Sequence, residues 1–242
     1  MSAALLRLPH VSRATVGGRA QATSPSQGSA SASDALVPLY EAVGPGRLLE
    51  VSGSVDGKVG SARTSTAVKL VYDAQRAGET TAWIQPRGGA LYPPDLDACG
   101  IDLDALLVVH VPTPAGANPA REHPHALCKA TELLLRSGAF GLVVVDFCHG
   151  TPPSGREAWQ GRLLGLARQH QSRVVLLTEK PSTADSLGTL IGARVEPRRY
   201  REPGGRTRGA GSFTVEHAIL KNKSGAAMHI AQEPRRGPWG MR

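Results

Sequence analysis

The chain has 242 residues, of which 40% are hydrophobic and only 4% aromatic, and its formal net charge is +8. This length suits one domain with or without tails, and the core must be built mainly from Val, Leu and Ala. Because the sequence has no run of 18 or more apolar residues, we expect neither a membrane-spanning segment nor a membrane partner.

The cysteines and the N-terminus indicate the compartment. Cys99, Cys128 and Cys148 are odd in number, and none of them belongs to a C-x-x-C pair. Reduced thiols of this kind are typical of a cytosolic protein. The apolar patch at the N-terminus is broken by Arg7, which leaves it too short for a secretory signal. The sequence therefore predicts a cytoplasmic location.

Composition divides the chain into three parts. Residues 1–35 are expected to form a flexible N-terminal segment, because almost no large apolar side chain occurs over residues 14–34. A core domain is expected over residues 36–232, beginning with a short helix that the Gly-Pro-Gly at 44–46 ends. Residues 233–242 are expected to form a basic C-terminal tail.

Apolar runs and helical periodicity alternate along the core. Runs typical of buried strands are followed by segments whose apolar residues recur every three or four positions. This alternation predicts an α/β fold with a mostly parallel sheet and helices on both faces. An antiparallel hairpin is expected at the sheet edge, over residues 211–232. The expected strands are 47–53, 80–85, 105–112, 140–147 and 173–180, and the expected helices are 63–78, 125–138 and 161–170.

The stretch GKVGSARTS, residues 57–65, resembles a phosphate-binding loop between an expected strand and an expected helix. Gly57 and Thr64 match the pattern G-x-x-x-x-G-K-[S/T], but Ala62 replaces the second glycine and Arg63 replaces the lysine. In such a loop, backbone N–H groups surround the phosphates. Chance similarity is the alternative for so altered a motif. The candidate nucleotide-binding residues are Gly57, Gly60, Ser61, Ala62, Arg63, Thr64, Ser65 and Asp146.

Asp146 ends the apolar run VVVD. A carboxylate at the carboxyl end of a buried strand, beside the Thr64 hydroxyl, suits a magnesium ion bound with the phosphates. The alternative is an ordinary turn or helix-capping aspartate. Thr64 and Asp146 are therefore the expected metal ligands, and ATP with Mg²⁺ is the candidate cofactor.

Positive charge is concentrated in residues 194–242, which hold eleven Lys and Arg against four Glu. Within this part, the stretch RVEPRRYREPGGRTR suits contacts to phosphates, and its tyrosine can stack on a base. The alternative is a solvated, mobile loop. The candidate DNA-binding residues are Arg194, Arg198, Arg199, Tyr200, Arg201, Arg206 and Arg208, with single-stranded DNA as the candidate partner.

The ordered series of these segments resembles the RecA-type recombinases, and is most similar to the ImuA family of RecA-like accessory proteins in bacterial SOS mutagenesis. The resemblance covers about residues 46–232 and is carried by GRLLEV, LYPPDLDACGIDLDALLV, LLLRSGAFGLVVVDF, ADSLGTLIGARVEPRRY and KNKSGAA. It implies a RecA-like P-loop core and a role in DNA repair. It also implies RecA and error-prone DNA polymerase subunits as partners.

Departures from the family pattern imply that ATP hydrolysis is lost. Arg87 lies where the family has the glutamate that activates water, and Glu179 lies where it has the glutamine that senses the γ-phosphate. We also expect the family's polymerisation element and C-terminal domain to be missing. Loss of base and sensor removes most transition-state stabilisation but leaves the fold intact. A non-hydrolysing accessory factor without catalytic residues is therefore expected, and a reduced DNA-dependent ATPase or a plain DNA-binding protein is the alternative.

Overall fold

The computed structural model describes residues 39–53, 60–89, 91–112, 119–147, 156–201, 212–223 and 232–236. All of these ranges fall within one compact unit, Leu36–Arg242. The expected flexible segment over residues 1–35 lies outside the described residues, as do residues 237–242 of the expected tail.

A nine-stranded sheet forms the centre of this unit, in the order β4-β3-β5-β6-β1-β7-β8-β9, with β2 paired to β7. The five strands from β4 to β1 are parallel to one another, whereas β7, β8 and β9 pair in antiparallel fashion. The expected fold class, with its antiparallel edge, is confirmed. The strands are β1 Arg47–Gly53, β2 Gly60–Ser61, β3 Thr81–Pro86, β4 Leu106–Val111, β5 Leu142–Asp146, β6 Arg173–Glu179, β7 Ala193–Arg201, β8 Ser212–Asn222 and β9 Gln232–Arg236.

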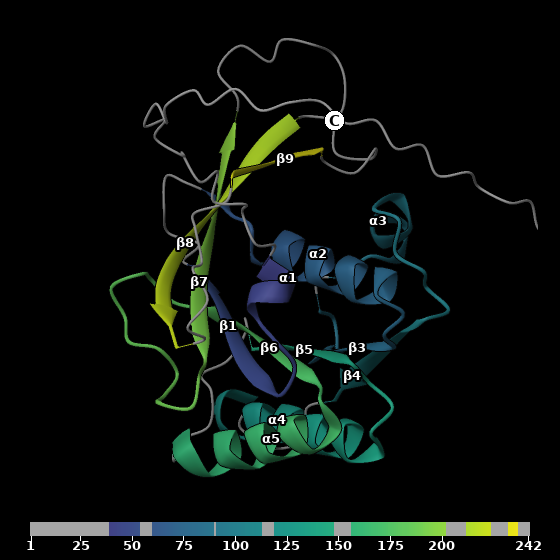
Figure 1. Cartoon of the computed structure of the whole chain (residues 1–242), viewed down its shortest axis with the longest axis vertical. Coiled ribbons are helices and arrows are strands. Elements are labelled where there is room, and N and C mark those ends of the chain that lie inside the picture. Colours follow the sequence, from purple (N-terminus) through teal and green to yellow (C-terminus); the bar gives the residue numbers. More distant parts are fainter. Residues whose placement is uncertain are drawn as a thin grey trace, which may run out of the picture. The chain divides into compact units, whose positions relative to one another are not determined.

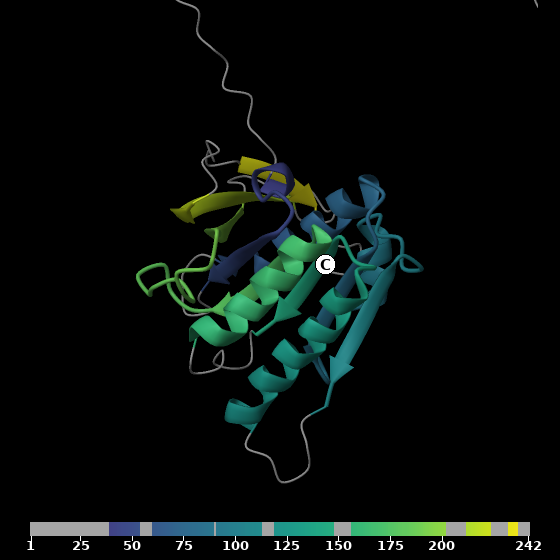
Figure 2. The ribbon, with the colours of Figure 1, turned by 60° about the horizontal axis from the view of Figure 1, so that its bottom comes forward.

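Helices cover both faces of the sheet. Helices α1 and α2 lie over one face, and α4 and α5 lie over the other (Figure 1). Figure 2 shows α4 and α5 side by side across the strands that they cover. In the described part of the chain, every helix is too short or too polar to cross a bilayer. The helices are α1 Leu39–Ala42, α2 Arg63–Arg76, α3 Pro93–Ala98, α4 Pro119–Ser137 and α5 Arg156–His170.

Two hydrophobic cores result from the alternation of side chains along the strands. Leu49, Trp83 and Val144 pack on the α2 side, while their sequence neighbours Leu48, Ile84 and Val145 pack on the α4–α5 side. Strands buried on both faces read as continuous apolar runs, which is why the runs 47–53 and 173–180 predicted β1 and β6 to within one residue.

The structure differs from expectation in the arginine-rich part of the chain. A solvated, mobile loop is the alternative to a DNA-binding stretch over residues 194–208, but residues 194–201 belong to β7, an internal strand between β1 and β8. Residues 233–236 of the expected tail belong to β9, which pairs with β8. Strand β7 could not be predicted from hydrophobic periodicity, because it contains charged residues. An internal strand can contain such residues only when partners elsewhere in the chain neutralise their charge.

Candidate functional site

The candidate loop leads to the edge where the parallel strands end. Strand β1 ends at Gly53, β5 at Asp146 and β6 at Glu179, and α2 begins at Arg63. Because the carboxyl ends of parallel strands share one edge of a sheet, this is the usual position of ligands in open α/β folds. The fold thus brings the two predicted elements, loop and strand-end carboxylate, to the same end of the sheet. Strand β6 lies between β1 and β5.

The Arg63 side chain is held by the protein itself. Its guanidinium Nη1 donates a hydrogen bond to the Thr178 carbonyl oxygen at 2.9 Å, and Nη2 lies 3.7 Å from Glu179 Oε2. The residue is only 9% exposed. Arg63 and Glu179 were each singled out in the sequence, but their pairing depends on how β6 lies beside β1. The charge expected to meet phosphate is therefore neutralised at the end of β6.

The returning part of the loop is a strand. Gly60 pairs with Arg199 and Ser61 pairs with Arg198, both in β7, and the Ala62 N–H donates to the Pro197 carbonyl oxygen at 3.1 Å. In a working P-loop, such N–H groups point at the phosphates. At Ala62 the donor is used by the sheet instead.

Gly53 permits this return of the chain. A Cβ atom added to Gly53 would lie 2.7 Å from Ser61 Oγ and 3.6 Å from Arg63 Cδ. A side chain at the end of β1 would therefore collide with the strand that follows the loop.

The remaining loop residues differ in accessibility. Thr64 is exposed and Ser65 half-buried in the first turn of α2, and Ala62 supplies no side-chain cap to that helix. Gly57 lies outside the described residues. Asp146 is 3% exposed at the end of β5.

This donor set fits ATP and Mg²⁺ only in part. The Thr64 hydroxyl and the Asp146 carboxylate are suitable oxygen ligands for magnesium at one edge of the sheet. The two donors that should grip phosphate, the Ala62 N–H and the Arg63 side chain, make hydrogen bonds inside the protein. Among the described residues of the loop, these two donors are therefore not directed at a phosphate.

Strand β3 ends in residues that cannot act as a general base. Arg87 follows the strand and is exposed, and its N–H donates to the Val111 carbonyl oxygen. Gln85, which the sequence analysis did not single out, is 1% exposed, and its carboxamide has no hydrogen-bond partner in the described part of the chain. Gly89 passes so close that an added Cβ would lie 2.4 Å from the Gln85 carboxamide. Neither side chain supplies a carboxylate.

The prediction that Arg194 contacts DNA is wrong. Its guanidinium donates to Ser52 Oγ and to the Pro181 carbonyl oxygen at 2.8 Å each, and to the Ala184 carbonyl oxygen. The side chain also lies 4.0 Å from Glu50 Oε1, and the residue is 2% exposed. A cation so enclosed has no surface with which to meet a phosphate.

Glu50 is the anion at the centre of this arrangement. It is fully buried in β1, accepts hydrogen bonds from Thr178 Oγ1 at 3.0 Å and from the Leu187 N–H at 2.9 Å, and pairs with Lys180 at 2.5 Å. Lys180 and Leu187 belong to the crossover between β6 and β7, residues 180–192. Glu50 and Arg194 together fix this crossover against β1, a role that no local pattern in the sequence indicated.

The other candidate DNA-binding residues are only partly available. Arg198 is paired with Glu196 at 2.6 Å, and this hydrogen bond raises the pKa of Arg198 above its ordinary value. Arg199 is exposed and stacks over the Phe213 ring at 5.3 Å, and Tyr200 is 37% exposed. The side chain of Arg201 lies outside the described residues, as do Arg206 and Arg208.

Comparison with known proteins finds partial sequence similarity to RecA proteins. The chain is 35% identical to the RecA protein of Saccharopolyspora erythraea over 101 residues, covering 42% of this chain and 25% of that protein. It is 27% identical to the RecA protein of Deinococcus radiodurans over 211 residues, covering 75% of this chain and 54% of that protein. No family model matches.

These similarities and the α/β fold support a RecA-like superfamily relationship. The chain spans between about a quarter and about half of the length of the curated relatives it matches. The activities and partners of whole RecA proteins are therefore matters for a proposal.

Proposed function

We propose that this chain is a RecA-like accessory protein of DNA repair, similar to ImuA, which acts in SOS translesion mutagenesis without hydrolysing ATP. It works by binding RecA and error-prone DNA polymerase subunits. The observation that carries the proposal is the state of Arg63, whose guanidinium is bound to Thr178 and Glu179.

The chemistry of phosphoryl transfer explains why this observation matters. Catalysis there is positioning and electrostatic stabilisation of charge on the transferred group. Here the candidate cation faces Glu179, and the position after β3 holds Arg87 in place of a base. A RecA-like subunit without hydrolysis can still present the surface by which such subunits recognise one another. We therefore propose that it docks at the end of a RecA filament and caps it.

The test is filament assembly. RecA is allowed to assemble on single-stranded DNA, and growth is followed by light scattering with and without this chain. We expect the chain to be retained by immobilised RecA and to stop growth at amounts well below one chain per RecA subunit. The Asp146→Asn variant should do the same, because capping does not use the metal ligand. A chain that neither binds RecA nor changes assembly would refute the proposal.

A DNA-dependent ATPase is the second candidate, and two positions favour it. Thr64 is exposed at the start of α2, and Asp146 lies at the same edge of the sheet. Steady ATP turnover stimulated by single-stranded DNA would support this function. That activity should then disappear in Asp146→Asn.

Plain DNA binding through β7 is a further candidate, and of its described side chains Arg199 and Tyr200 favour it, because both are exposed. Deleting residues 194–208 would remove an internal strand, so point substitutions are the appropriate test. Binding through this surface should weaken with salt and should be lost in an Arg199→Gln, Tyr200→Ala double variant that keeps its fold.

A further inference from the structure

A hollow of about 370 Å³ lies at the amino ends of the strands, opposite the candidate loop. Four elements form it: the start of β1, the end of α5, the end of the crossover 180–192, and the residue after β8. Its polar lining comes from Arg47, Arg168, Gln171, Thr189 and Lys223.

The charge of this hollow is one-sided. Arg47, Arg168 and Lys223 contribute three cations, and among the described residues that line the hollow there is no Asp or Glu. Within the described part of the chain, neither Arg47 nor Arg168 has a carboxylate partner. Like charges that converge without an anion mark a place where an external anion is favoured.

Two glycines lie beside the side chains of Arg168 and Arg47, and Lys223 is hydrogen-bonded to the backbone. Gly46 has φ +73°, and a Cβ atom there would lie 3.3 Å from Arg168 Cα and Cγ. A Cβ on Gly192 would lie 3.9 Å from Arg47 Cβ and Cδ. Lys223 Nζ donates to the Thr189 carbonyl oxygen at 3.0 Å. Arg168 is exposed and Arg47 half-buried, so both side chains are accessible to a ligand from outside.

The neighbouring Lys221 reports the same positive environment. Burial lowers its pKa below the ordinary value, and the charge of Lys223 lowers it further, while Glu50 acts in the opposite direction. Lys221 Nζ donates to the Gly188 carbonyl oxygen at 2.7 Å. Positive charge thus extends from the hollow along the end of β8.

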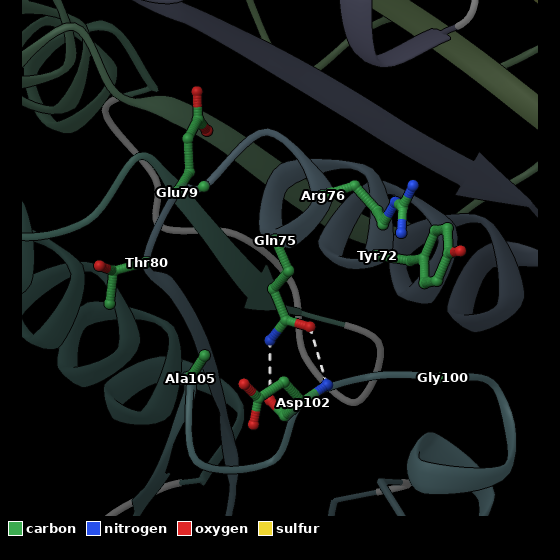
Figure 3. A pocket seen from close by; sticks show the side chains of 9 residues that line it. Tyr72, Gln75, Arg76, Glu79, Thr80, Gly100, Asp102 and Ala105 are labelled. Carbon is green, nitrogen blue, oxygen red and sulfur yellow. Dashed lines mark hydrogen bonds between the residues drawn. The ribbon is translucent and has the colours of Figure 1, made fainter. Parts of the chain in front are cut away.

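A second hollow, of about 330 Å³, provides the contrast (Figure 3). There Arg76 is accompanied by Glu79 and Asp102, so the lining carries both signs of charge. Gln75 closes one side with two hydrogen bonds to the Asp102 backbone, at 2.8 and 2.9 Å. An anion gains little there, which leaves the amino-end hollow as the candidate for anion recognition.

We propose that the amino-end hollow binds an acidic peptide segment of a protein partner, with an aliphatic side chain between its carboxylates. Leu164 and Leu190 are partly exposed in the wall and offer that side chain an apolar contact. The guanidinium groups of Arg47 and Arg168 suit carboxylates in bidentate geometry. The proposal goes beyond the proposed function, because it depends neither on the loop nor on RecA.

A peptide fits this hollow better than nucleic acid does. None of the described residues that line the hollow is aromatic, so they offer bases nothing on which to stack. A phosphate backbone is a continuous line of charge that suits an open groove, whereas a hollow of this size takes only a few side chains.

The test uses a short fluorescein-labelled peptide of alternating glutamate and leucine, with fluorescence anisotropy on the full chain. We expect binding that falls by about tenfold when both Arg47→Gln and Arg168→Gln are present, since two exposed ion pairs are lost. A peptide with glutamine in place of glutamate should bind to the unaltered chain no more tightly than the acidic peptide binds to the double variant. This second arm does not depend on the folding of a variant.

The control is a double variant, Arg76→Gln with Arg136→Gln, which removes the same charge from exposed positions outside the hollow. It should bind the acidic peptide as well as the unaltered chain does. Equal loss in both double variants would overturn the proposal, because the attraction would then be unspecific. Absence of peptide binding would also overturn it. The proposal would also be overturned if an oligothymidylate bound to the chain and this binding were lost in the Arg47→Gln, Arg168→Gln double variant.

Discussion

Two groups of arginines in and around the parallel sheet are used in opposite ways. At the carboxyl end of β6, Arg63 faces Glu179, and near the start of β7, Arg194 is enclosed with Glu50 of β1. At the amino end, Arg47 and Arg168 line a hollow whose described lining residues include no Asp or Glu. An arginine whose counter-charge comes from its own chain is a structural element. One without such a partner is available for binding, and only the three-dimensional arrangement separates the two cases.

The difference has an energetic basis. Two charges removed from water are stable only with good geometry and further hydrogen bonds, and removing one partner leaves the other uncompensated. Exposed cations without a partner carry no such penalty when they are replaced. Substitution of the enclosed cations or their partners should therefore lower the free energy of unfolding, whereas substitution of the cations in the amino-end hollow should change it little.

The largest effect is expected for Glu50→Gln. This substitution leaves Lys180 and Arg194 without the buried carboxylate that neutralises them. We expect the free energy of unfolding to fall by about 3–5 kcal/mol, measured by chemical denaturation. The matched control is Glu41→Gln, at an exposed position of α1, which should change stability by about 0.5 kcal/mol or less. A loss at Glu50 no larger than this would contradict the structural role of the network.

A more direct comparison uses two arginines that are register partners in neighbouring strands, Arg47 of β1 and Arg173 of β6. Arg173 pairs with Glu79 at 2.6 Å, donates to the Val43 carbonyl oxygen at 2.9 Å and stacks over the Tyr40 ring at 4.2 Å. Arg173→Gln should lower the free energy of unfolding by about 2–3 kcal/mol.

Arg47→Gln should change the same quantity by about 0.5 kcal/mol or less. Both variants are compared in one denaturation series. Equal losses would mean that Arg47 has a structural partner after all, and the contrast between the two kinds of arginine would fail.

The smallest effect concerns Lys221. The charge of Lys223 is one of the causes that lower its pKa, so Lys223→Gln should raise the pKa of Lys221 towards its ordinary value. Because the charged form of a lysine is favoured when a neighbouring cation is removed, the direction of this change is fixed. NMR titration of the lysine side-chain signals measures it. An unchanged or lower pKa would show that the end of β8 is not a region of excess positive potential.

The sequence revealed the fold wherever strands are apolar on both faces. The runs at 47–53 and 173–180 predicted β1 and β6 because continuous hydrophobic burial is a local property. Strand β7 was not predicted, because the burial of its Arg194 depends on Glu50 and Ser52, which lie far away in the sequence. A hydrophobic pattern gives the polarity of each side chain, but it does not identify the distant residue that neutralises a charge.

The candidate site was predictable to the same degree. The motif and the strand-end carboxylate placed Thr64 and Asp146 at one edge of the sheet, and both lie there. That the Ala62 N–H and the Arg63 guanidinium donate within the protein depends on the pairing of β2 with β7 and on the position of β6. The amino-end hollow could not be predicted from the sequence, because its residues come from four separate segments with no shared motif.

The most direct test of the central claim is ATP turnover by the purified chain, with and without single-stranded DNA, alongside Arg63→Ala and Asp146→Asn. If the cation at the carboxyl end is neutralised by Glu179, turnover stays at background in all three proteins under both conditions. Steady turnover that single-stranded DNA stimulates, and that both substitutions abolish while circular dichroism shows an intact fold, would contradict the account and establish a working ATPase.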